Sequence, residues 1–356
     1  MEMDEIGITY KNLQETLVAS IRTGIKSLTD ISNTVEQLNT SMPKKIITGP
    51  AFGRTNWISS LLKDQGTDME IGFPVSSEFN MGNIKSRILP KREVLSIIHT
   101  GPVDQKHMTS KKLWEYVTKK GLISDEFIME FYLDSNNPQG NEIEIQFIIH
   151  NWQELFTQHT ERVLGADIAK TINPKPLELE AALEARLEWA KKAIIKANCH
   201  ASEVETYDIL SSCAHVFPSE PIEKMKSTYE TARETMTPLA SIDHVLAMMT
   251  KDRAWGSAPI REENVLIATK NPANREAFEK ATTSAEKRRA ACFCPVIRNS
   301  LDDADIPKEY CLCSAGWFRR QWEGALSQSV KVDILKTVLK GDEVCQFAIL
   351  IPENLK

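Results

Sequence analysis

The sequence predicts an α+β protein of two domains, and three observations carry that prediction. First, 356 residues exceed the length over which one hydrophobic core usually keeps growing. Second, residues 1–150 repeat one strand-helix-strand-strand order, which predicts a curved antiparallel sheet with its helices on one face. Third, apolar stripes of helical spacing replace strict alternation after residue 151, and they predict a helix-rich α+β domain that ends in a β-hairpin.

Composition limits the classes of protein and partner. Hydrophobic residues make up 42% and charged residues 26%, as in ordinary globular proteins. No apolar run approaches the roughly 20 residues of a spanning helix, and the acidic start does not resemble an export signal, so we expect a cytoplasmic protein without a membrane partner. Residues 1–151 carry 16 Lys and Arg against 19 Asp and Glu, so no nucleic-acid partner is expected directly. The oligomeric state is not determined by the sequence.

The repeat is visible at an offset of 77 residues. The apolar strands predicted at 16–22 and 93–99 both end just before a Thr-Gly dipeptide. A stretch with helical spacing follows each strand, and further strands are predicted at 45–52 and 127–133. The closing strands, 69–75 and 143–149, align most clearly because both alternate apolar and polar residues.

Period-two alternation assigns the faces of these strands. We expect the helices to cover one apolar set, which comprises Met69, Ile71, Phe73, Val75, Phe127, Met129, Phe131, Leu133, Ile143, Ile145, Phe147 and Ile149. The opposite face is then predicted to hold an acidic and aromatic set, which comprises Glu70, Glu130, Tyr132, Glu142, Glu144 and Gln146. If the sheet is strongly twisted, that helix-free face forms a groove.

Several motifs in this region occur together and in order. They are Asp68–Val75 in the middle and, in the second half, Ile88-Leu89-Pro90, His99-Thr100-Gly101-Pro102, Glu130-Phe131-Tyr132-Leu133 and Glu142-Ile143-Glu144-Ile145. In this pattern, residues 4–150 resemble the gyrase-inhibitor-like (GyrI-like) small-molecule-binding domain. The resemblance implies that a small hydrophobic molecule, often a cation, is bound or sensed in the groove.

Two functions are consistent with this resemblance. In the first, the groove binds a hydrophobic cationic or aromatic ligand through Glu70, Glu130, Tyr132 and Glu144, with Trp57 as a further candidate. In the second, the domain is a hydrolase that detoxifies a reactive cyclopropane-type molecule, with Glu130 or Glu144 as general base. The sequence alone would equally allow these acids to be solvated residues of an exposed sheet.

A boundary is predicted after residue 151. Residues 152–176 read as a connecting helix and linker that ends at the Asn-Pro-Lys-Pro break, and residues 177–356 as the second domain. Its last 40 residues or so loosely resemble the end of four-vinyl-reductase-like small-molecule-binding domains, a resemblance that names no ligand. The chain is expected to end in a hairpin around the Lys340-Gly341-Asp342 turn.

Two cysteine pairs mark the second domain. Cys292 and Cys294 are followed, after 16 residues, by Cys311 and Cys313. Four thiolates can hold zinc in a tetrahedron, so zinc is the candidate cofactor. The single residue within each pair departs from the two that zinc ribbons usually have. Buried or redox-active thiols and an iron-sulfur cluster are therefore alternatives.

Overall fold

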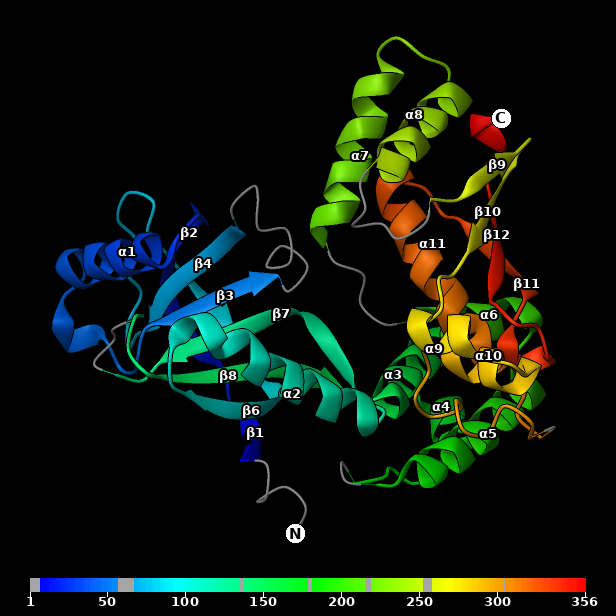
Figure 1. The fold of residues 1–356 in the computed structure, drawn as a ribbon, viewed down its shortest axis with the longest axis horizontal. Helices are drawn as coiled ribbons and strands as arrows, with labels where there is room; N and C mark the ends of the chain where they lie inside the picture. Colours follow the sequence, from blue (N-terminus) through cyan, green and yellow to red (C-terminus); the bar gives the residue numbers. More distant parts are fainter. Residues whose placement is uncertain are drawn as a thin grey trace. The chain divides into compact units, whose positions relative to one another are not determined.

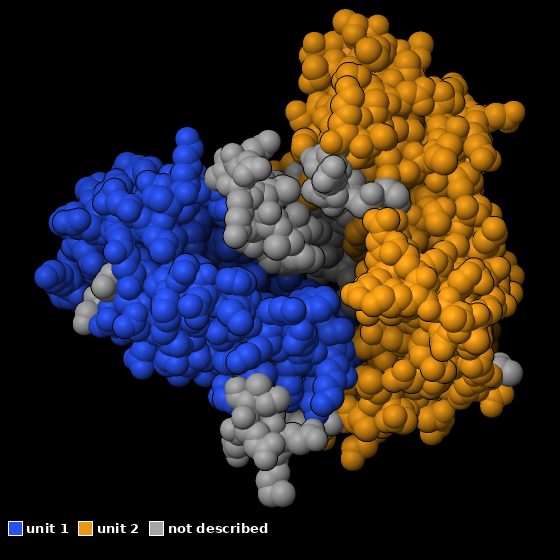
Figure 2. Space-filling model, viewed as in Figure 1, with its two compact units in different colours: residues 1–150 blue, residues 151–356 orange. Residues whose placement is uncertain are grey.

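The computed structural model describes residues 7–56, 67–134, 138–178, 181–214, 219–251, 258–303 and 305–356. The chain folds into two compact units, residues 1–150 and 151–356, which Figure 2 colours separately. Both units combine helices with antiparallel strands, so the predicted α+β class is confirmed. Among the described residues, none of the helices combines the length and apolar character that crossing a bilayer requires.

The first unit is an eight-stranded antiparallel sheet with two α-helices (Figure 1). The strands lie in the order β1-β6-β8-β7-β3-β4-β2-β5. Their bounds are β1 Ile8–Leu13, β2 Thr16–Ile25, β3 Phe52–Asn56, β4 Thr67–Pro74, β5 Lys85–Leu89, β6 Arg92–Thr100, β7 Ile123–Tyr132 and β8 Glu142–His150. The helices are α1 Leu28–Ser41 and α2 Lys106–Lys119, with 3-10 turns η1 Lys44–Ile46 and η3 Val103–Gln105. The strand predicted at 45–52 is therefore wrong, because its first residues form η1 and the strand begins at Phe52.

The order of the strands confirms the duplication. One half is β5-β2-β4-β3, the other is β1-β6-β8-β7, and β3 pairs with β7 between them. The two halves exchange their edge strands. Strand β1 directly precedes β2 in the chain but pairs with β6, and β5 directly precedes β6 but pairs with β2. Cross-strand pairing makes Ser20 and Ser96 equivalent, each opposite the closing strand of its half, so the paired strands are offset by 76 residues and the predicted offset of 77 is wrong by one.

Short connections force this sheet to curl. Only residues 14 and 15 link β1 to β2, and only residues 90 and 91 link β5 to β6. Three residue steps span at most about 11 Å. In a flat sheet, β1 and β2 would be six strand spacings apart, or about 29 Å. The two edges therefore approach each other at the end where these connections lie.

The two faces of the curled sheet differ in what covers them. Helix α1 packs on β2 and β4, and α2 packs on β6, β7 and β8, all on the face that holds Ile71 and Ile145. We call this the helix-covered face and the opposite one the concave face. The predicted apolar residues of both closing strands are buried on the helix-covered face, as expected: Met69, Ile71, Phe73, Ile143, Ile145 and Phe147.

The second unit is rich in helices and has a sheet of four strands. The helices are α3 Trp152–Leu164, α4 Ala166–Ile172, α5 Leu183–His200, α6 Glu203–Ser212, α7 Ser219–Arg233, α8 Pro238–Lys251, α9 Arg275–Lys280, α10 Ser284–Ala291 and α11 Leu312–Leu326. The strands are β9 Ile260–Glu262, β10 Val265–Thr269, β11 Lys331–Lys336 and β12 Gln346–Leu350, in the order β11-β12-β10-β9. Short 3-10 turns are η5 Lys308–Cys311, η6 Val338–Lys340 and η7 Glu353–Leu355. Strands β11 and β12 pair antiparallel, which is the predicted terminal hairpin.

Helix α3 belongs to this second unit and does not act as a linker. Phe156 is fully buried in a core with Leu187 and Trp189, and Trp152 packs on Phe156 at a ring-centroid distance of 5.3 Å. The interpretation of residues 152–176 as a connection is corrected accordingly. Aromatic burial of this size stabilises a core strongly, so α3 contributes to the fold of the unit that follows it.

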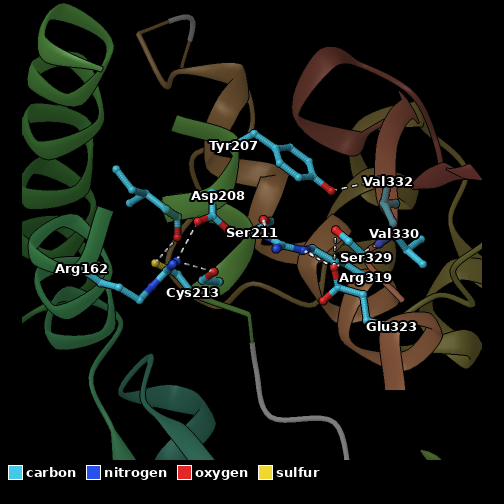
Figure 3. A network of polar contacts seen from close by, with 12 residues as sticks. Arg162, Tyr207, Asp208, Ser211, Cys213, Arg319, Glu323, Ser329, Val330 and Val332 are labelled. Carbon is cyan, nitrogen blue, oxygen red and sulfur yellow. Dashed lines mark hydrogen bonds and ion pairs between the residues drawn. The ribbon is translucent and has the colours of Figure 1, made fainter. Parts of the chain in front are cut away.

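A polar network joins three helices of the second unit (Figure 3). Asp208 of α6 accepts hydrogen bonds from Arg162 of α3 at 3.0 Å and from Arg319 of α11 at 2.8 Å. Burial alone would raise the pKa of Asp208, but these two arginines hold it below its usual value. Close approach of α6 and α11 requires Gly316, because a Cβ there would lie 1.7 Å from the backbone oxygen of Ser211.

Candidate functional site

Strand register divides the predicted site residues between the two faces. In β7 and β8, Glu130 lies opposite Ile145 and Phe131 lies opposite Glu144. Directly opposed residues share a face, so Glu130 is on the helix-covered face and Glu144 on the concave face. The prediction that Glu130, Tyr132 and Glu144 share the helix-free face is therefore wrong for the first two. The prediction that the alternate set of β7 lies beneath the helices is wrong for the same reason, since Phe127, Met129 and Phe131 are on the concave face.

The reason lies in the composition of β7. Both of its alternating sets are largely apolar, since Ile128 and Tyr132 fall in one set and Met129 and Phe131 in the other. Alternation alone cannot choose between two such sets, and a shift of one residue reverses every side chain. Pairing of Phe131 with Glu144 and with Phe52 fixes the choice.

Glu130 lies in a closed cluster beneath α2. Its carboxylate accepts a hydrogen bond from Lys106 Nζ at 2.7 Å and a longer one from Tyr132 Oη at 3.4 Å, and both glutamate and tyrosine are buried. Burial and the adjacent Glu130 charge raise the pKa of Tyr132 well above its usual value. Gly53 makes room for this cluster, because a Cβ there would lie 2.6 Å from Tyr132 Oη. The arrangement is a satisfied internal ion pair.

Glu70 lies on the concave face and is held by three residues. Arg87 donates to both carboxylate oxygens, at 2.7 and 2.5 Å, and Ser20 Oγ donates at 2.8 Å. Arg54 Nη1 lies 3.5 Å from the same carboxylate. Burial would raise the pKa of Glu70, but these donors and positive charges lower it below its usual value.

Glu144 occupies the equivalent place in the other half of the sheet. It accepts hydrogen bonds from Lys11 Nζ at 2.5 Å and from Gln146 Nε2 at 3.0 Å. Lys11 on edge strand β1 corresponds to Arg87 on edge strand β5. Lys11 lies opposite Val94 and Arg87 opposite Val18, and these two valines are equivalent in the duplication. The concave face thus carries two pseudo-symmetric ion pairs between an edge-strand cation and a closing-strand carboxylate.

An apolar floor lies on the same face. Val18, Phe52, Leu89 and Met129 are buried together and Phe131 packs against them, although neither α1 nor α2 covers this side. The rings of Phe52 and Phe131 lie 6.0 Å apart at 43°, a tilted aromatic contact. Gly72 leaves space for this floor, because a Cβ there would meet Phe52 at 3.0 Å. The face therefore combines aromatic surface with fixed charges.

Cations were the functional residues that the sequence did not identify. Arg54 stacks its guanidinium 3.5 Å above the ring of Phe127, and Arg92 is buried at the start of β6. Lys11, Arg54, Arg87 and Arg92 all share the concave face by register. The alternation of these cations with apolar residues is visible in the sequence. Their partners are not, because they depend on the order of the strands, which local sequence does not encode. Trp57, the remaining candidate, lies outside the described residues.

The cysteines of the second unit gather from three segments. Cys292, Cys294, Cys311 and Cys313 are near enough for their charges to act on one another, and Cys345 joins them. Burial raises the pKa of each of the four predicted ligands, that of Cys313 to about 12. Thr337 Oγ1 donates to Cys311 Sγ at 3.2 Å. Across the described ranges, no group of three or more His, Cys, Asp or Glu side chains has an arrangement that could hold a metal ion.

One family model matches most of the first unit. Residues 8–150 match the family model described as the GyrI-like small molecule binding domain. A search of curated proteins finds no match to the sequence.

Several solved structures are similar to about 40% of the chain. EcmrR in a complex with DNA has 22% identity over 40% of this chain and 57% of its own, with a TM-score of 0.36. A hydrolase from Listeria innocua has 12% identity over 40% and 91%, with a TM-score of 0.30. SAV2435 bound to tetraphenylphosphonium has 10% identity over 41% and 96%, with a TM-score of 0.31. The chain thus spans little more than half the length of EcmrR.

Proposed function

We propose that residues 8–150, which match the GyrI-like small molecule binding domain, bind a hydrophobic, aromatic small molecule on their concave face. The observation that carries the proposal is the apolar floor formed by Phe52, Phe131 and Met129 on a sheet face that neither α1 nor α2 covers. Aromatic rings next to fixed polar groups are the usual lining of small-molecule sites, since rings supply contact area and polar groups supply orientation.

The carboxylates of the concave face do not favour a positively charged ligand. A cationic ligand was expected because of Glu70 and Glu144, but each carboxylate already pairs with a cation of the domain. A cationic ligand would have to displace Lys11 or Arg87 and leave that cation without its partner. The geometry therefore supports the aromatic character of the predicted ligand and gives no support to its positive charge.

Binding is favoured over hydrolysis by the state of the two candidate bases. Glu130 is bound to Lys106 at 2.7 Å and Glu144 to Lys11 at 2.5 Å. Each carboxylate is thus already engaged by a cation of the domain, and neither is free to position a substrate water. The role we propose is that of a sensor or a sequestering protein, and the net charge of −6 supports a direct ligand over nucleic acid.

Fluorescence titration of the full chain with phenylnaphthylamine, a neutral aromatic dye that brightens in apolar surroundings, tests the proposal. We expect saturable binding that Phe131→Leu weakens about two- to tenfold, because leucine keeps apolar volume but loses the ring contact. The matched control is Phe293→Leu, which removes a half-exposed ring from the second unit. Non-saturable binding, or an equal loss in both variants, would contradict the proposal.

A further inference from the structure

Among the described residues, the concave face contains a buried cation without a counter-ion. Arg92 is 8% exposed, and its Nη1 donates to the backbone oxygen of Pro90 at 3.2 Å. Its Nε is buried and has no hydrogen-bond partner within the described residues. In that same part of the chain, no carboxylate lies within ion-pair distance of it. A buried guanidinium without a counter-ion costs free energy, and a bound anion would reduce that cost.

Neighbouring charges increase this cost. Burial lowers the pKa of Arg92, and the positive charges of Arg87 and Arg54 lower it further. Glu70 is the acid of this region, but its oxygens already accept from Arg87 and Ser20. Arg92 therefore lies near two other arginines, and the carboxylate that those two share, Glu70, is already bound to Arg87.

Among the described residues, the buried and half-buried charges of the concave face are in positive excess. Its buried and half-buried charged side chains are the cations Lys11, Arg54, Arg87 and Arg92 and the carboxylates Glu70 and Glu144. Asp125, in the irregular part of β7, adds one acidic charge that acts on Arg54. Cations still outnumber acids, so this interior attracts an anion more strongly than a cation.

A second buried atom indicates what else the ligand carries. Gln146 is 4% exposed, and its Oε1 has no hydrogen-bond partner among the residues described. Gln146 lies opposite Ser96, which is four residues along β6 from Arg92 and on the same face. Four residues of strand span about 13 Å, roughly the length of a small fused-ring molecule. An N–H or O–H donor at the far end of the ligand would satisfy this oxygen.

We propose that the concave face binds an aromatic acid, with its oxyanion on Arg92 and a donor group on Gln146. The proposal rests on the proposed function and adds the charge of the ligand. The fork of N–H donors on a guanidinium matches the oxygens of a carboxylate or sulfonate, and such charge-assisted bonds are strong where water is excluded. Val94, fully buried on the same face between the two polar ends, supplies apolar contact.

The test compares two dyes with the same rings and the same secondary amine in titrations of the full chain. Anilinonaphthalene sulfonate carries an anionic group that the neutral phenylnaphthylamine lacks. We expect the sulfonate to bind at least about tenfold more tightly, as one charge-assisted contact provides. Arg92→Met should abolish this difference and leave binding of the neutral dye within about twofold. The control Lys85→Met removes an exposed cation of the same face and should preserve the difference.

A stability measurement separates a binding role from a structural one. Arg92→Met removes an unpaired buried charge, so the variant should unfold at the same or a higher urea concentration than the unchanged protein. Equal affinity for the two dyes, or a preference that survives Arg92→Met, would overturn the inference while the proposed function stands. A marked loss of stability would also overturn it, because the guanidinium would then be a structural element. Failure of both dyes to bind would instead contradict the proposed function.

Discussion

At the scale of single residues, ion pairs define the concave face. Glu70 and Glu144 are equivalent by the duplication, yet their surroundings differ: two arginines and a serine surround Glu70, whereas one lysine and a glutamine contact Glu144. The half with Glu70 also lies near the unpaired Arg92. The two halves thus share one framework, and the side chains around their equivalent carboxylates differ.

The Glu70 ion pair predicts a specific pH dependence. Glu70→Gln should lower the free energy of unfolding by about 1–3 kcal/mol near neutral pH, because Arg87 and Arg54 lose their charged partner. The folded pKa of Glu70 lies below its usual value of 4.5, so its contribution is present above that pH. The contribution is lost as the pH falls through the folded pKa, and the difference between the two proteins should vanish in acid.

Urea unfolding at about pH 7 and about pH 3 measures this difference. Glu142→Gln, which changes an exposed carboxylate on the same face of β8, should stay within about 0.5 kcal/mol at both values. A deficit for Glu70→Gln that is equally large in acid would show that the loss comes from shape and not from charge.

At the scale of elements, the edge strands β1 and β5 supply the cations that pair with the carboxylates of the closing strands β8 and β4. Strands β1 and β5 each bring a cation to a carboxylate in the opposite half of the sequence. Lys11 and Glu144 lie 133 positions apart in the sequence, and strand order alone brings them together. Residues of the two repeats are thus interdependent, and neither repeat contains a complete site.

The cysteine segments carry a prediction that belongs to this scale. The sequence predicts that purified full chain, prepared without added zinc, contains about one zinc ion per chain on the thiolates at 292–294 and 311–313, although the described side chains form no such metal group. Elemental analysis checks this, and Cys311→Ser should lower the content while Cys199→Ser, at an exposed thiol, should not. Less than about 0.2 zinc per chain would leave the thiols as neutral core residues, consistent with their raised pKa values.

At the scale of the whole molecule, the division at residue 150 predicts which fragments fold. A chain that ends at His150 contains all eight strands and both helices of the first unit, so it should be soluble and unfold cooperatively. A chain that ends at Pro174 adds α3, whose Trp152 and Phe156 pack in the second unit. That longer fragment should expose apolar surface and associate.

Size-exclusion chromatography and thermal unfolding of the two fragments distinguish these outcomes. The reverse result, with the longer fragment folded and the shorter one not, would show that α3 completes the first unit.

The sequence by itself determined the duplication, the two units and the apolar residues of the two closing strands beneath the helices. These follow from local periodicity: Ile71 and Phe73, or Ile145 and Phe147, alternate with polar neighbours and can be buried on one face only. The face of Glu130 was decided by tertiary structure, because both sets of side chains on β7 are apolar and only pairing with β3 and β8 fixes the register. Tertiary structure also decided that Glu70 and Glu144 pair with Arg87 and Lys11, since those partners depend on edge strands exchanged between the halves.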